Sequence, residues 1–157
     1  LLREDAVTSV VKGLFPLAAL VTPNSFEAEM LTGKRAAADD EALDVAKALL
    51  AMGPGAVLLK GGHRGASGCD DLYLDQHGRQ EWLRGERLDQ KHTHGTGCTL
   101  SAAIASFLAC GMDALESCCE GKRYITGAIR NAFPIGQGTG PVNHLWQSDG
   151  FKNRPMR

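Results

Sequence analysis

The chain has 157 residues, of which 43% are hydrophobic and 22% charged, and its formal net charge is -1. These values are typical of one globular domain with a single sizeable core, and a near-neutral chain without a basic run argues against nucleic acid as a partner. No apolar run approaches the ~20 residues of a membrane-spanning helix, so we expect no membrane partner. Five cysteines without the spacing of a disulfide framework favour a reducing cytoplasm.

The first third of the chain predicts a helix, a strand and a second helix. Apolar side chains recur at helical spacing in residues 2–15, and the apolar run 17–22 is typical of a strand buried on both faces of a parallel sheet. A turn at Asn24 then leads into a helix over residues 26–31, which Gly33 ends.

Two residues at that turn also carry chemistry. Asn24 and Glu27 stand three positions apart, so an amide and a carboxylate can face one point and hold Mg²⁺ through its waters. The same spacing is that of a helix cap, in which the negative charge of Glu27 only interacts with the positive end of the helix dipole. On spacing alone, both interpretations stand.

The middle of the chain predicts an α/β fold. Residues 39–52 form an amphipathic pattern and residues 56–60 a buried strand, so the order of elements indicates a mostly parallel sheet flanked by helices. Lys60 ends that strand, either as a solvated surface charge or as a phosphate contact at the edge where such sheets bind ligands. The polar stretches 69–75 and 79–84 predict a hairpin at the edge of the sheet.

The strongest chemical signal is the sequence His-Thr-His-Gly-Thr-Gly-Cys at residues 92–98, followed by a run to residue 109 that predicts a helix. Glycines permit tight turns, and the first amides of a helix are unpaired and partly positive, so the turn is suited to phosphate. Cys98 would lie in the first turn, where the thiolate is favoured. The alternatives are a glycine loop that only caps a buried helix, and a metal site that uses His92, His94 and Cys98.

Residues 113–132 predict the last helix, with Cys118, Cys119 and Ile125 facing inward. Because adjacent helical positions point about 100° apart, we interpret the two cysteines as buried thiols and not as metal ligands. The glycine-rich residues 136–144 follow, and such a loop is weak evidence by itself.

Several separated motifs resemble those of one family. Residues 92–98 resemble the anion-hole signature of ribokinase-like kinases, and the His-Thr-His lead-in with Cys in place of Asp is similar to hydroxymethylpyrimidine/phosphomethylpyrimidine kinases of thiamin biosynthesis. Residues 22–24 with Glu27 resemble the Asn-x-x-Glu motif, residues 60–63 the Lys-Gly-Gly-His motif, and residues 136–144 the closing Gly-Pro-Val-x-His segment of that family.

The resemblance implies a ribokinase-like α/β fold whose N-terminal strands are missing. Residues 1–148 would be the C-terminal, ATP-binding portion of one domain, and residues 149–157 a polar tail. It implies ATP and Mg²⁺ as cofactors, with phosphoryl transfer to 4-amino-5-hydroxymethyl-2-methylpyrimidine and then to its monophosphate. Since missing strands expose a sheet edge, we expect a homo-oligomer or pairing with the N-terminal portion.

The resemblance also assigns roles to single residues. Gly95, Thr96 and Gly97 would form the catalytic anion hole, and Cys98 would take or orient the hydroxyl proton. Asn24 and Glu27 would organise Mg²⁺. The residues expected at the ATP site are Asn24, Glu27, Lys60, His94, Gly138 and Val142.

Other functions stay open. A Cys-type pyridoxal kinase shares the Gly-Thr-Gly-Cys loop, and its differences fall in the portion expected to be absent. Hydroxyethylthiazole kinase also has the loop, but the His-Thr-His lead-in and the Gly-Pro-Val-Asn-His ending argue against it. From another class, a non-catalytic nucleotide-binding module would bind ATP without transferring phosphate.

Overall fold

The structure is a computed structural model, and it describes residues 4–61 and 69–148. The chain divides into two compact units, residues 1–87 and 88–157, which are treated separately below. Within the described residues, no helix is both long enough and apolar enough to cross a membrane.

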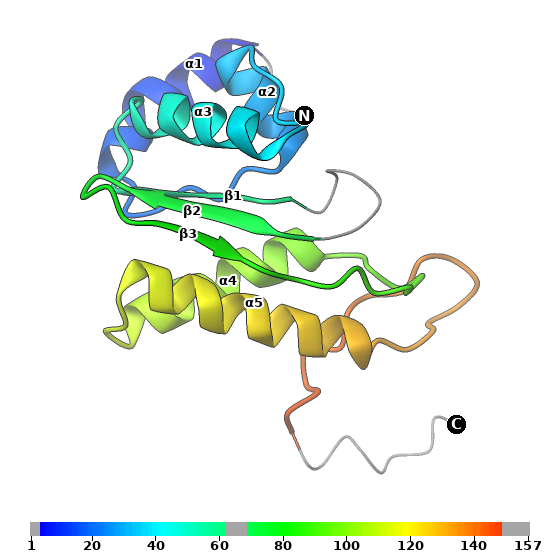
Figure 1. Cartoon of the computed structure of the whole chain (residues 1–157). Helices are drawn as coiled ribbons and strands as arrows, with labels where there is room; N and C mark the ends of the chain where they lie inside the picture. Colours follow the sequence, from blue (N-terminus) through cyan, green and yellow to red (C-terminus); the bar gives the residue numbers. More distant parts are fainter. Residues whose placement is uncertain (1–3, 62–68, 149–157) are drawn as a thin grey trace. The chain divides into compact units, whose positions relative to one another are not determined.

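Three helices of the first unit confirm the sequence predictions. They are α1 (Glu4–Gly13), α2 (Ser25–Thr32) and α3 (Asp39–Leu50) (Figure 1). Gly33 ends α2 in the left-handed conformation, with φ of 70°, and its N–H bonds the Glu29 carbonyl. A glycine adopts this conformation without the steric cost that a Cβ brings.

The strand predicted over residues 17–22 is only partly correct. Its start is the 3₁₀ helix η1 (Phe15–Leu17), where Pro16 fixes φ and lacks the N–H that a sheet partner would need. The rest of the segment runs parallel to β1 (Ala56–Leu59), with Val21 paired to Val57 and Asn24 to Lys60 as isolated bridges.

A three-stranded sheet forms in the order β1, β2 (Asp71–Asp75) and β3 (Gln80–Leu83), and both strand pairs are antiparallel. A mostly parallel sheet is therefore wrong for these strands. Parallel pairing needs a long crossover, usually helical, whereas β2 and β3 are joined by the tight turn predicted for a hairpin. Parallel pairing occurs in the described residues only as isolated bridges, which join segment 18–24 to residues 57–60 and His94 to Pro141.

The edge position predicted for the hairpin holds for β3 alone. Strand β2 lies in the centre of the sheet, and its residues Asp71, Leu72, Tyr73 and Leu74 are buried. Polar Asp71 is compatible with burial because its Oδ1 accepts the Gly61 N–H at 2.8 Å.

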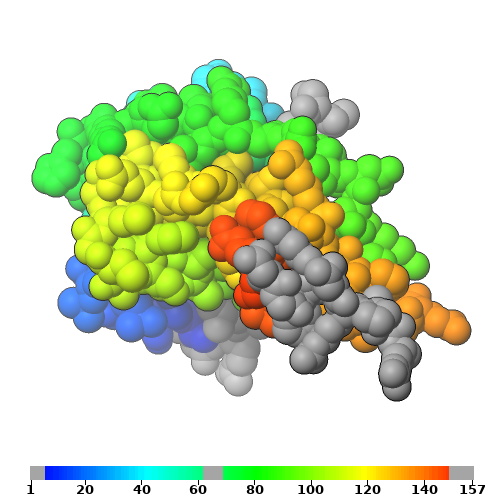
Figure 2. All heavy atoms as spheres, turned by 90° about the horizontal axis from the view of Figure 1, so that it is seen from below, coloured from blue at the N-terminus to red at the C-terminus, as the bar shows by residue number. Residues whose placement is uncertain are grey.

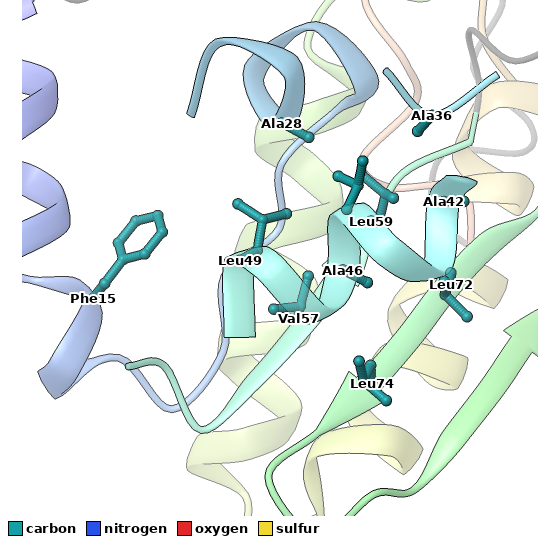
Figure 3. Packing of buried hydrophobic residues seen from close by; sticks show 11 residues of the cluster. Phe15, Ala28, Ala36, Ala42, Ala46, Leu49, Val57, Leu59, Leu72 and Leu74 are labelled. Carbon is teal, nitrogen blue, oxygen red and sulfur yellow. The ribbon is translucent and has the colours of Figure 1, made fainter. Parts of the chain in front are cut away.

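The core of the first unit lies between the helices and the sheet. Helix α3 contacts α2, β1 and β2, and aliphatic side chains from these elements converge there (Figure 3). Alanines at the contacts, such as Ala28 and Ala46, are fully buried and let the backbones approach closely.

The second unit is built on two helices, α4 (Thr96–Ala109) and α5 (Ala114–Arg130), which pack against each other. A Cβ on Gly121 of α5 would lie 2.5 Å from Ile104 of α4, so this glycine permits the close packing. Cys118 is buried as predicted, but Cys119 is exposed, because the two adjacent positions face different directions on the helix.

Replacing Leu49, which is 0% exposed, with alanine should test the core. Leu49→Ala should lower the free energy of unfolding by about 2–5 kcal/mol, since it removes buried methyl groups and leaves a cavity. Leu17→Ala is the control, because Leu17 is 81% exposed. Urea unfolding measures both, and equal losses in the two variants would contradict the packing described.

Candidate functional site

The turn before α4 is fixed by its own residues. Gly95 is the N-cap residue in the left-handed conformation, with φ of 83°. The N–H and hydroxyl of Thr99 both donate to the Gly95 carbonyl, at 2.9 and 2.8 Å, and the Thr96 hydroxyl donates to the Thr93 carbonyl at 2.6 Å. The helix thus begins two residues before Cys98, which lies in the first turn as predicted.

This helix terminus presents unpaired donors. No side chain caps it and its first turn holds no acidic residue. Within the described part of the chain, the amides of Gly97 and Cys98 have no hydrogen-bond acceptor. Cys98 is exposed. Two free amides, the helix dipole and an exposed thiol therefore meet at one point, which suits an anion that exchanges a proton.

A second segment is hydrogen-bonded to the approach to this turn. The His94 N–H donates to the Gly140 carbonyl at 3.2 Å, and the Val142 N–H donates to the His94 carbonyl at 3.3 Å. The structure thus brings predicted site residues His94 and Val142 together beside Gly95. The Val142 side chain is 2% exposed and belongs to the core. Gly138 is exposed and has no neighbour where a Cβ would stand.

A pocket of about 570 Å³ opens beside Cys98. Its apolar lining includes Ala102, Ala103 and Phe107 from α4 and Tyr124 from α5. The sequence reasoning missed these residues, because the pattern of an amphipathic helix does not distinguish a pocket wall from a core face. Pockets of this size accommodate small-molecule ligands.

His144 and Gln147, from the stretch 143–147, complete the lining of the pocket. Three contacts hold this stretch on α5: the Asn143 N–H bonds the Ala128 carbonyl at 3.0 Å, the Tyr124 hydroxyl bonds the His144 carbonyl, and Trp146 covers Gly127. Figure 2 shows the stretch, in red-orange, against the yellow residues of α5.

The first unit holds the other predicted residues. Asn24 and Glu27 form a reciprocal cap: Asn24 Oδ1 accepts the Glu27 N–H at 2.8 Å, and Glu27 Oε2 accepts the Asn24 N–H at 2.7 Å. The capping interpretation is therefore confirmed. Lys60 joins them through its parallel bridge to Asn24. Gly62 and His63 of the Lys-Gly-Gly-His motif lie outside the described residues.

The donor set is compatible with a hydrated cation at Glu27. The carboxylate is exposed, and its Oε1 has no hydrogen bond within the described residues. Across residues 4–61 and 69–148, no three His, Cys, Asp or Glu side chains form a metal-binding group, so a cation would need waters and ligand oxygens as further ligands. The same finding removes the alternative of a metal site at His92, His94 and Cys98.

Residues 1–143 match the model of the family described as phosphomethylpyrimidine kinase. The chain belongs to this family. It is 44% identical to a hydroxymethylpyrimidine/phosphomethylpyrimidine kinase of Streptomyces coelicolor, over 93% of this chain and 54% of that protein. It is 43% identical to the thiamine biosynthesis bifunctional protein ThiED of Geobacter sulfurreducens, over 98% of this chain and 31% of that protein. The chain thus spans about half the length of the kinase it matches.

Solved structures confirm the ribokinase-like α/β fold class. An ADP complex of Bacillus subtilis pyridoxal kinase superposes with a TM-score of 0.86 at 34% identity, covering 94% of this chain and 57% of that one. A phosphomethylpyrimidine kinase from Clostridium difficile gives a TM-score of 0.69 at 36% identity, covering 82% and 51%.

Gly95→Ala should destabilise the second unit by about 1–2 kcal/mol, because a Cβ is strained at this positive φ. The matched control is Gly138→Ala, where the backbone is not left-handed and space is open. Thermal unfolding followed by circular dichroism compares the two. A Gly95 variant as stable as the control would mean that the left-handed cap is not required.

Proposed function

We propose that this protein transfers the γ-phosphoryl group of ATP to 4-amino-5-hydroxymethyl-2-methylpyrimidine and then to its monophosphate. The observation that carries the proposal is the N-terminus of α4, where the free amides of Gly97 and Cys98 adjoin an exposed thiol. Membership of the phosphomethylpyrimidine kinase family supports the same chemistry.

The mechanism follows from positioning and charge. The acceptor hydroxyl oxygen attacks the γ-phosphorus as the bond to the bridging oxygen of ADP breaks, and the hydroxyl proton passes to Cys98 or is oriented by it. Gly95 shapes the turn in which Thr96, Gly97 and Cys98 direct the α4 N-terminus at the moving phosphoryl group. Amides held in place before the reaction stabilise developing charge without reorganising.

The second unit would hold the adenine ring of the nucleotide, and the first unit carries the residues expected at its phosphates. The pocket beside Cys98 suits an adenine ring, because small and aromatic side chains line it. The exposed His94 and Gly138 would contact the nucleotide outside this lining. Lys60 would offset phosphate charge. Glu27, with Asn24, would hold Mg²⁺, which when bound supplies further neutralisation of the phosphates.

Pyridoxal is the second candidate acceptor. Pyridoxal kinases are similar in structure: that of Staphylococcus aureus in complex with AMP-PCP and pyridoxal has a TM-score of 0.88 at 30% identity, over 94% of this chain and 55% of that one. The hydroxymethylpyrimidine kinases are closer in sequence, at 40–44% identity, which favours the pyrimidine. Self-association, pairing with a further portion and a cytoplasmic location stay predictions.

The decisive experiment incubates this chain with MgATP and each acceptor separately and follows phosphorylated product by ³¹P NMR. We expect phosphorylation of the pyrimidine and its monophosphate, with less product from pyridoxal. MgATP binding measured by calorimetry without any product would instead support a nucleotide-binding module. More product from pyridoxal than from the pyrimidine would identify the chain as a pyridoxal kinase, the second candidate function.

Cys98→Ala should lower kcat by about 100-fold or more, as expected for a lost proton-transfer group, while the Kd of ATP changes little. Cys110→Ala is the matched control, because Cys110 is an exposed cysteine at the other end of the same helix. Steady-state kinetics and calorimetry measure both constants. An unchanged kcat in Cys98→Ala would refute the proton-transfer role.

The Glu27→Gln variant separates the role of Glu27 in capping α2 from its proposed role in binding Mg²⁺. Glutamine still accepts the Asn24 N–H, so stability should change by less than about 0.5 kcal/mol. The Mg²⁺ concentration needed for half-maximal ATP binding should rise about tenfold because a negative ligand is lost. Glu41→Gln is the control, since Glu41 accepts the Ala37 and Ala38 amides at the start of α3. An equal Mg²⁺ response in both variants would refute the cation site.

A further inference from the structure

The imidazole of His92 makes an unusual contact for a residue so close to the catalytic turn. Its Nδ1 accepts the backbone N–H of Gly140 at 2.8 Å, although the two residues are 48 positions apart in the chain. The ring is half-buried, and the backbone N–H of His92 is itself held by Gln90 Oε1 at 3.1 Å. The ring therefore stands in a fixed place.

Gly140 fits this contact only as glycine. A Cβ there would lie 2.8 Å from His92 Nδ1 and 3.0 Å from the Phe133 carbonyl, so a larger residue would force the ring or the backbone away. The Gly140 peptide then uses both polar groups: its N–H goes to His92, and its carbonyl accepts the His94 N–H. One buried glycine thus joins two residues of the approach to α4.

The hydrogen bonds continue to α5. The Val142 N–H bonds the His94 carbonyl, and the Asn143 N–H bonds the Ala128 carbonyl. Residues 140–143 therefore connect the backbone immediately before Gly95 to the C-terminal end of α5. A second link between this approach and α5 runs through Gln90, whose Nε2 donates to the Ile129 carbonyl at 3.5 Å.

We propose that His92 is a positioning residue: through Gly140 it fixes the segment 92–95 and so aims the free amides of Gly97 and Cys98. This inference rests on the proposed phosphoryl transfer. His92 does not line the pocket, and its ring bonds the Gly140 backbone, so it acts on the reaction through the backbone. Because Nδ1 accepts an N–H, the ring proton is on Nε2.

The loss of this acceptor should affect the transition state more than ground-state binding. A buried Gly140 N–H without a partner would move to find one, and the His94–Gly140 bond would move with it. The Gly97 and Cys98 amides would then donate to the phosphoryl group with poor hydrogen-bond geometry. Interactions that strengthen as charge develops appear in kcat, whereas the adenine contacts that set ATP affinity lie elsewhere in the pocket.

Three variants test the proposal. His92→Leu removes the acceptor and should lower kcat about 10- to 100-fold with the KM for ATP changed less than about threefold. His92→Asn places Oδ1 where Nδ1 stands and should restore most of kcat. Leu49→Ala is the control for stability alone, because Leu49 is fully buried in the core of the first unit and belongs neither to the pocket lining nor to segment 92–99.

A readout independent of turnover accompanies the kinetics. ¹⁵N NMR should find Nδ1 of His92 unprotonated in the wild-type chain, and hydrogen exchange at the hydrogen-bonded amides of Gly140 and His94 should accelerate in His92→Leu and not in His92→Asn. Unchanged kcat in His92→Leu, or equal loss in His92→Leu and His92→Asn, would overturn the proposal. If the wild-type chain transfers no phosphate, the proposed function fails, and the exchange rates alone decide: faster exchange only in His92→Leu supports the positioning role, and equal exchange overturns it.

Discussion

The left-handed conformation of Gly95 is the constraint on which the candidate site depends. With φ of 83°, it allows α4 to begin at Thr96 without a side-chain cap. The helix dipole and the unpaired amides of Gly97 and Cys98 then face outward together. A residue with a Cβ at position 95 would strain the backbone at the one point where the direction of α4 is set. This turn also determines that Cys98 lies in the first turn of α4, where its thiol is exposed.

Other helices of the chain treat their first turns differently. In α2, Asn24 and Glu27 bond each other's amides, and in α5 Asp113 accepts the Glu116 N–H. Each of these termini is closed by an acceptor and carries an acidic residue in its first turn. Glu27 Oε1 has no hydrogen bond in the part of the chain that the structure describes, so it is available to a cation. The uncapped, acid-free terminus of α4 suits an anion, so the proposed division of labour, phosphate at α4 and Mg²⁺ at α2, follows from how each helix begins.

Local signals predicted much of this from the sequence. The cap at Asn24, the glycine stop at Gly33 and the first-turn place of Cys98 all depend on neighbouring residues. What failed depended on distant partners. The apolar run 17–22 fits a strand, yet it pairs with residues 57–60 only through isolated bridges. Strand β2 is central because β1 and β3 pair on its two sides, and Asp71 tolerates burial there because it accepts the Gly61 N–H. The bond between His92 and Gly140 spans 48 positions, and no periodicity reports it.

Helix α5 contacts several other parts of the second unit that contribute to the candidate site. Gly121 admits Ile104 of α4 on one part of its surface, and Gly127 admits Trp146 on another, since a Cβ at either position would collide with these side chains. Between them, Tyr124 contributes to the pocket and bonds the His144 carbonyl. The same helix therefore fixes the position of α4, the far wall of the pocket and, through Ala128, the segment that carries Gly140. A displacement of α5 would alter all three together. Substitutions on its buried face should therefore change nucleotide affinity and the orientation of the Gly97 and Cys98 amides in parallel.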